Sequence, residues 1–220
     1  MHHNSILPRT FTIISFLFLS TFIVLGQNKM NEKIRYQKQS KQDMAPSLIA
    51  FQSNIVVENN SLGKDMEALL FQSLDNQLIE KQTIYGSLGL KHVKFQHYYK
   101  GYPVEGSVYV SHLKNQTLDS ANGTCFNNIN VNTSLGISAD QALASVDAYL
   151  INKIGSAEKR LYNTGDLIIA LASFEVSADN LRLTYQYKLK SLADYHNYAI
   201  YIDAQTGEVL ITVTKKNHYP

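Results

Sequence analysis

The chain has 220 residues, of which 45% are hydrophobic and 17% are charged, and its formal net charge is +2. This is the composition of a folded globular protein with room for one medium domain or two small ones. The near-neutral balance and the lack of a long basic cluster exclude the usual electrostatic pattern of a nucleic-acid-binding protein.

The N-terminus has the pattern of a secretory signal peptide. Arg9 precedes a continuously apolar or small stretch at 11–25, and the sequence turns polar directly after Gly26. A membrane-spanning helix needs about 20 apolar residues, so this shorter core, ending in a small residue, favours cleavage near Gly26. We predict a signal peptide at 1–26 and a secreted or periplasmic protein with no membrane association after cleavage. An uncleaved N-terminal anchor is the alternative.

The first half of the mature chain predicts a lead-in, a strand and a helix. Residues 27–45 are polar and aperiodic, which is typical of a mobile segment, and 46–60 predict one short strand. Over 61–80 the apolar residues recur at helical spacing, which predicts an amphipathic helix. These residues are Met66, Leu69, Leu70, Leu74 and Leu78.

A β-hairpin is predicted next. Residues 91–99 alternate in the manner of a half-buried strand, and 104–113 form a second strand. Gly101 accepts positive φ and Pro103 ends the ladder, so Lys100 to Pro103 are expected to form the turn between them. A further turn is predicted at Asn122-Gly123. Two sets of side chains divide between the faces of the first strand: Val93, Phe95, His97 and Tyr99 on one, and His92, Lys94, Gln96 and Tyr98 on the other.

The second half predicts one helix and then strands. Ser138 and Gln141 have capping-box spacing at the start of a helix over 138–151. Strand-like runs follow near 166–175, 181–190, 197–202 and 208–214, and Gly207 suits a left-handed position in the last hairpin loop. Because both halves run from a helix into antiparallel strands, we predict an α+β fold of two small helix-on-sheet units in tandem, at 46–130 and 131–214. Residues 215–220 are predicted to be a tail or a processing linker.

Motifs for catalysis and metal binding are missing from the sequence. It has no H-E-x-x-H, no G-x-S-x-G and no phosphate-binding glycine loop. His92 and His97 fall on opposite faces of one strand and cannot share an ion, whereas His112 is placed to approach His97 across the hairpin. Two histidines alone make a weak metal site. Cys125, the only cysteine, is expected to be a small structural residue. We predict no catalytic residue, metal or cofactor, and an enzyme site built from His97, His112 and Cys125 is the alternative.

Two stretches resemble known families. Residues 89–113 (GLKHVKFQHYYKGYPVEGSVYVSHL) resemble the FTP motif of thermolysin-like and fungalysin-like zinc metallopeptidase precursors, through His92 to Gln96, Tyr99 to Gly101, Pro103-Val104 and Gly106. Residues 136–213 look like a PepSY domain, through Ser138 to Ala144 and Tyr198 to Leu210. A signal peptide, an FTP motif and a PepSY domain follow one another in this order in bacterial thermolysin-like pro-regions.

The resemblance implies a pro-region that acts as intramolecular chaperone and inhibitor of a secreted zinc metalloendopeptidase. Its zinc-binding peptidase domain is expected outside this chain and would be the partner, in cis or in trans. A cystatin/PepSY-like fold is expected for the two units. A stand-alone secreted protease inhibitor or binding module acting in trans is the alternative. The expected contact residues lie at the hairpin turn: Tyr99, Gly101, Tyr102, Pro103 and Val104.

Overall fold

The computed structural model describes residues 31–215 apart from 42, 54 and 58–60, and it has a mixed α+β fold dominated by strands. The predicted signal peptide at 1–26 and tail residues 216–220 lie outside the described residues. The helices are α2 (Leu62–Leu70), α3 (Ala139–Ile154) and the short η1 (Ala178–Asn180). The strands are β1 (Ile34–Lys38), β2 (Leu48–Phe51), β3 (Asn76–Tyr85), β4 (Leu90–Tyr99), β5 (Tyr102–Lys114), β6 (Thr117–Thr124), β7 (Lys159–Leu161), β8 (Asp166–Leu171), β9 (Leu181–Ser191), β10 (Asn197–Asp203) and β11 (Val209–Lys215).

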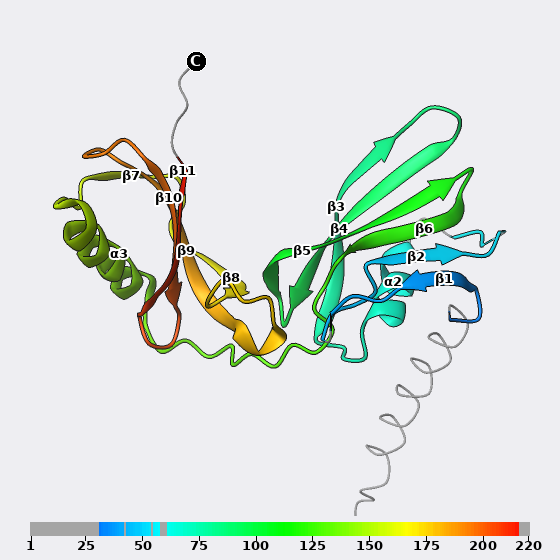
Figure 1. Ribbon diagram of the computed structural model, residues 1–220, viewed down its shortest axis with the longest axis horizontal. Coiled ribbons are helices and arrows are strands. Elements are labelled where there is room, and N and C mark those ends of the chain that lie inside the picture. Colours follow the sequence, from blue (N-terminus) through cyan, green and yellow to red (C-terminus); the bar gives the residue numbers. More distant parts are fainter. Residues whose placement is uncertain (1–30, 42, 54, 58–60, 216–220) are drawn as a thin grey trace, which may run out of the picture.

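The strands form two antiparallel arms that meet at β5 (Figure 1). The N-terminal arm runs in the order β1-β2-β6-β5-β4-β3, and the C-terminal arm runs β8-β9-β10-β11, with β7 also paired to β9. A parallel bridge between Val104 in β5 and Ile169 in β8 joins the arms. In Figure 1, α3 lies on the side of the C-terminal strands that faces away from the N-terminal arm.

Each arm has its own hydrophobic core with one helix packed against strands. The C-terminal core also takes in Met44, Tyr99, Val104 and Phe126 from the N-terminal part of the chain, so the arms share buried surface where they meet. Burying one large apolar side chain stabilises a fold by roughly 1.5–3 kcal/mol. The buried helix residues are Leu62, Met66 and Leu70 in α2 and Ala142, Val146 and Leu150 in α3.

The ends of α3 follow the sequence prediction. The Ser138 hydroxyl accepts from the Gln141 amide at 3.2 Å, and the Gln141 side chain accepts from the Ser138 amide at 2.8 Å, which completes a capping box. At the other end Gly155 adopts φ 74°, a left-handed C-cap that any other residue enters at a cost.

Replacing Ser138 with Ala is expected to lower the free energy of unfolding by about 1 kcal/mol, because the Gln141 amide at the helix start loses its acceptor. Urea denaturation followed by circular dichroism measures this change. Ser134→Ala is a matched control. The Ser134 backbone amide donates to Asn132 Oδ1, and the Ser134 hydroxyl does not accept a hydrogen bond from any amide of α3. Equal stability of Ser138→Ala and the unmodified chain would contradict the role of the cap.

The helix predicted over 61–80 is too long. α2 ends at Leu70, Leu74 is 66% exposed, and Leu78 is buried on strand β3. The intervening Ser73 and Asp75 form a turn, in which the Ser73 hydroxyl accepts from the Asp75 amide at 3.2 Å. Serine and aspartate stabilise such turns through their own side chains, and the chain reverses to pair with β4. Helical spacing of leucines beyond Leu70 therefore does not reflect a helix.

Three further local predictions need correction. Strand β1, paired with β2, lies within the segment 27–45 that was predicted to be a mobile lead-in. The hairpin turn consists of Lys100 and Gly101 alone, and Tyr102 and Pro103 already pair with β4. Asn122-Gly123 lies inside β6, opposite β5, rather than in a turn. The chain reverses instead at Asn115-Gln116, both of which have positive φ.

No helix in the described part of the chain combines the length and apolar character needed to cross a bilayer.

Candidate functional site

The turn between β4 and β5 is a tight two-residue loop. Lys100 has φ 48° and Gly101 has φ 84°, the pair of left-handed residues that a type I′ hairpin turn requires. The Lys100 amide donates to the Asp75 carbonyl at 2.8 Å, and its ammonium lies 5.1 Å from the centre of the Tyr99 ring. The turn is therefore tied to the end of the α2–β3 connection, and its shape is fixed from two sides.

The five residues predicted to contact a partner differ in exposure. Tyr99 and Val104 are buried in the C-terminal core, and their side chains help to join the two arms. Tyr102 and Pro103 are half-buried, and Gly101 is exposed, with open space where a side chain would extend. The surface that this turn offers to a partner is thus Gly101 with the outer parts of Tyr102 and Pro103. Contact with a partner at this turn stays a prediction.

A buried polar cluster lies behind the turn. His97 is fully buried, and its Nε2 lies 2.9 Å from Asn76 Oδ1 while its Nδ1 lies 2.8 Å from Ser107 Oγ. The Asn76 carbonyl oxygen accepts only, so Nε2 carries the proton and Nδ1 accepts from the Ser107 hydroxyl. The ring also stacks on Phe71, with centroids 4.6 Å apart. Burial lowers the pKa of His97 from 6.5 to about 3, so the imidazole is neutral at neutral pH.

The cluster has the composition of a Ser-His-Asn catalytic triad without its accessibility. Ser107, His97 and Asn76 are all buried, whereas a nucleophile needs an open path to its substrate. Neighbouring Cys125 is also buried, and burial raises the pKa of its thiol to about 12 although the Ser107 hydroxyl opposes this. A protonated, enclosed thiol is a poor nucleophile. These residues therefore fix the position of strands rather than attack a substrate.

His112 pairs with His92 rather than with His97. The two stand directly opposite on β5 and β4, and their Nδ1 atoms are 2.6 Å apart on the face of the sheet away from His97. His112 Nε2 lies 2.5 Å from Asn122 Oδ1, which assigns the proton of His112 to Nε2. The prediction that His92 and His97 take opposite faces is correct. The predicted approach of His112 to His97 is wrong, because cross-strand register pairs His112 with His92.

Within the described residues, no group of three or more histidine, cysteine, aspartate or glutamate side chains is arranged to hold a metal ion.

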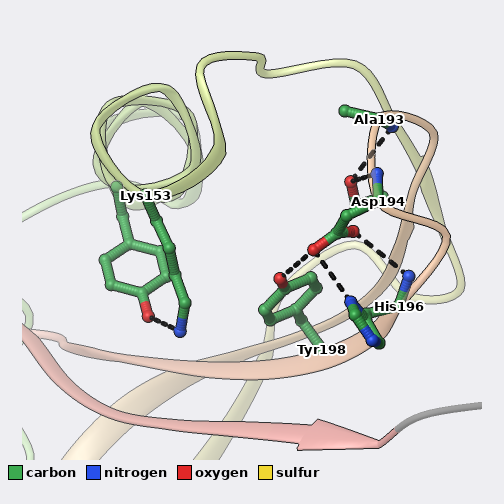
Figure 2. Close-up of polar contacts among 7 residues, drawn as sticks. Lys153, Ala193, Asp194, His196 and Tyr198 are labelled. Atoms are coloured by element: carbon green, nitrogen blue, oxygen red, sulfur yellow. Dashed lines mark hydrogen bonds and ion pairs between the residues drawn. The ribbon is translucent and has the colours of Figure 1, made fainter.

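A second polar cluster secures the β9–β10 loop beside α3 (Figure 2). The Asp194 carboxylate accepts from the Tyr198 hydroxyl at 2.5 Å, from the His196 ring at 3.0 Å and from the His196 amide at 3.1 Å. Partial burial by itself raises the pKa of Asp194, but these hydrogen bonds outweigh it and hold the pKa well below its usual range. On α3, the Lys153 ammonium donates to the Tyr149 hydroxyl at 2.8 Å and lies over the Tyr198 ring. These hydrogen bonds to the Asp194 carboxylate hold the β9–β10 loop in place.

Sequence reasoning missed the buried cluster because it placed Asn76 on a helix. With 76–85 taken as the strand next to β4, Asn76 stands opposite Tyr99 and within reach of His97. A histidine on the apolar face of a strand, as His97 is, was a signal that polar partners had to be found for both ring nitrogens.

Comparison with known proteins gives a family match within this part of the chain. Residues 76–125 match the family described as the Fungalysin/Thermolysin Propeptide Motif, or FTP. The matched span runs from the start of β3 to Cys125, and it includes the β4–β5 turn together with Asn76, His97 and Ser107. Among solved structures, the Bacillus megaterium YpeB C-terminal domain is similar at 12% identity and a TM-score of 0.37, over 78% of this chain and 73% of that one. The family match thus places a fungalysin/thermolysin propeptide motif at residues 76–125.

Proposed function

We propose that the chain acts as the pro-region of a secreted thermolysin-like zinc metalloendopeptidase, as a chaperone for its folding and an inhibitor of its active site. The match of residues 76–125 to the propeptide motif carries this proposal. Burial of Ser107, His97 and Cys125 supports a binding role over catalysis by the chain itself. The zinc ion of such a pair would belong to the peptidase domain, whether that domain is joined in cis or met in trans.

The finer architecture is part of the same proposal. Residues 46–130 would form the FTP-type unit and 131–214 a PepSY-like unit, each with a cystatin/PepSY-like helix on a sheet. The capping box of α3 and the Asp203 to Gly207 loop carry the PepSY resemblance in the second half. A preformed sheet platform lowers the ordering cost of a partner that folds against it, which is the physical basis for a chaperone role.

The test mixes the purified chain with the mature thermolysin-like peptidase secreted by the same organism. Inhibition with a Kd below about 1 μM and a higher yield of active enzyme after refolding are the expected results. Absence of both effects would contradict the proposal.

Within this proposal, the β4–β5 turn meets the peptidase through Gly101, Tyr102 and Pro103. Tyr102→Ala is expected to raise the inhibition constant about tenfold, as the loss of an aromatic anchor does at other interfaces. Tyr36→Ala, which removes an exposed tyrosine from β1, is the matched control. Because Tyr102 also packs against the C-terminal core, the urea midpoint of each variant is measured alongside. Unchanged inhibition by a folded Tyr102→Ala chain would remove the turn from the interface.

A further inference from the structure

A carboxylate without a cationic partner lies where the two arms of the sheet meet. Glu105 follows Val104, whose side chain enters the C-terminal core, so strand alternation directs Glu105 toward the opposite face of the C-terminal arm. There its Oε1 accepts from Gln186 Nε2 at 2.9 Å and from the Tyr201 hydroxyl at 2.6 Å. Gln186 and Tyr201 stand opposite each other on β9 and β10 and are themselves hydrogen-bonded at 2.8 Å.

This arrangement fixes the carboxylate in position. Gln186 and Tyr201 are both buried, and their donors converge on a single oxygen of Glu105, which leaves Oε2 without a hydrogen-bond partner among the described residues. Burial, followed by the hydrogen bond and the charge of Glu105, raises the pKa of Tyr201, so its hydroxyl stays a donor. No lysine, arginine or histidine nitrogen of the described chain lies within ion-pair distance of Glu105.

The carboxylate lies at an apolar pocket of about 330 Å³. Its walls are Leu171, Phe174, Val176, Ile211 and Val213, and Tyr201 adds an aromatic surface. Phe174 is 82% exposed, so most of its ring surface is available to a ligand. A cation on an aliphatic stem suits such a pocket, because the stem packs on apolar walls and the charge meets the carboxylate and the aromatic faces.

A second pocket of about 250 Å³ adjoins the first through Val213. It is lined mainly by apolar surface of β9, β10 and β11 together with Tyr162, and Lys188 stands among its polar residues. An extended polypeptide that places a basic side chain against Glu105 would reach this second pocket with a neighbouring apolar side chain. The two pockets together favour a polypeptide over a free small cation.

We infer that the Glu105 pocket binds an arginine or lysine side chain of a partner polypeptide. Glu105 supplies the charge, Gln186 and Tyr201 position it, and Phe174 covers the stem of the bound side chain. Binding at this pocket does not require the partner to be a zinc peptidase.

The test titrates the ¹⁵N-labelled full chain with the peptide acetyl-Leu-Arg-Leu-amide and follows the amide resonances by NMR. The matched probe is the same peptide with citrulline, the neutral isostere of arginine. We expect the arginine peptide to shift the resonances of Phe174, Tyr201 and Val213, and the citrulline peptide to bind up to about fivefold more weakly, the scale of a partly exposed ion pair. Glu105→Gln, which keeps an oxygen for both donors, is expected to remove the preference for arginine. Glu158→Gln, an exposed acid outside the pocket, should keep it.

Equal binding of the arginine and citrulline peptides by the unmodified chain, or shifts confined to other regions, would overturn the inference. A preference for arginine that survives in Glu105→Gln would do the same. Should that variant lose its dispersed spectrum, the comparison of the two peptides on the unmodified chain, together with Phe174→Ala, decides the question. A site elsewhere would leave the affinity of Phe174→Ala unchanged, whereas the proposed site predicts weaker binding.

Discussion

Between pH 6.5 and about 4.5, the free energy of unfolding is expected to fall by up to about 1.4 kcal/mol for each pH unit, because the folded state keeps His97 uncharged. The pKa of His97 is about 3 in the folded chain and 6.5 when unperturbed. Below pH 6.5 the unfolded chain therefore binds a proton that the folded chain does not. The stability is fully present above pH 6.5 and is lost as the pH falls toward 3, by a total on the order of 4 kcal/mol.

The physical reason is burial, which removes the water that would solvate a charged imidazole. Protonated His97 would donate from both nitrogens, so the Ser107 hydroxyl that now donates to Nδ1 would have to reorient, and Phe71 covers the ring. Asp194 contributes to the free energy of unfolding over a separate, more acidic pH range. Its lowered pKa gives stability that is present above the usual carboxyl pKa of 3.8 and lost as the pH falls below it. Measurements above about pH 4.5 therefore separate the contribution of His97 from that of Asp194.

Urea denaturation at several pH values measures this slope, with His97→Gln as the test variant. Glutamine offers one donor and one acceptor and does not titrate, so His97→Gln is expected to be less stable at pH 7 and to show a flatter pH dependence. His112→Gln, on the open face of the sheet, should retain the slope of the unmodified chain. If His97→Gln and the unmodified chain lost stability in parallel between pH 6.5 and 4.5, another group would be responsible.

Gly123→Ala is expected to lower the free energy of unfolding by about 2–3 kcal/mol, the usual scale of overpacking in a close-packed interior. A Cβ at this position would lie 2.2 Å from the Val108 carbonyl oxygen and 2.7 Å from both Cα and Cδ2 of Tyr109. These atoms belong to the neighbouring strand β5 and to a fully buried ring, so neither can move without disturbing the N-terminal core. A fall in Tm of roughly 5–10 °C is the corresponding thermal change.

Gly101→Ala is the matched control for this prediction. Nothing lies within 4 Å of a Cβ at Gly101, and the penalty there comes only from φ 84°, which costs about 1 kcal/mol. Differential scanning calorimetry of both variants separates the two kinds of glycine. If the Gly123→Ala chain were as stable as the Gly101→Ala chain, strands β5 and β6 would be able to move apart at Gly123, and the prediction would be wrong.

Local patterns in the sequence were enough for several features of the molecule. The alternation over 91–99 separates the buried Phe95 and His97 from the open face, because neighbouring side chains on a strand point in opposite directions. The capping residues of α3 and the left-handed Gly101 and Gly207 follow from local backbone requirements. The FTP resemblance over 89–113 falls within the matched family span. All of these depend on interactions between residues close in sequence.

Only the tertiary structure decided what depends on register and on distant strands. Leucine spacing over 61–80 fits a helix, but pairing with β4 converts 76–85 into a strand and so brings Asn76 to His97. The register of β4 and β5 places His112 directly opposite His92. Gly123 looks like a turn residue and instead allows two strands to approach closely. Glu105, Gln186 and Tyr201 lie up to 96 positions apart, and no local pattern relates them. Helical and strand spacing report local preference, whereas cross-strand pairing, which the whole sheet fixes, determines which polar groups meet.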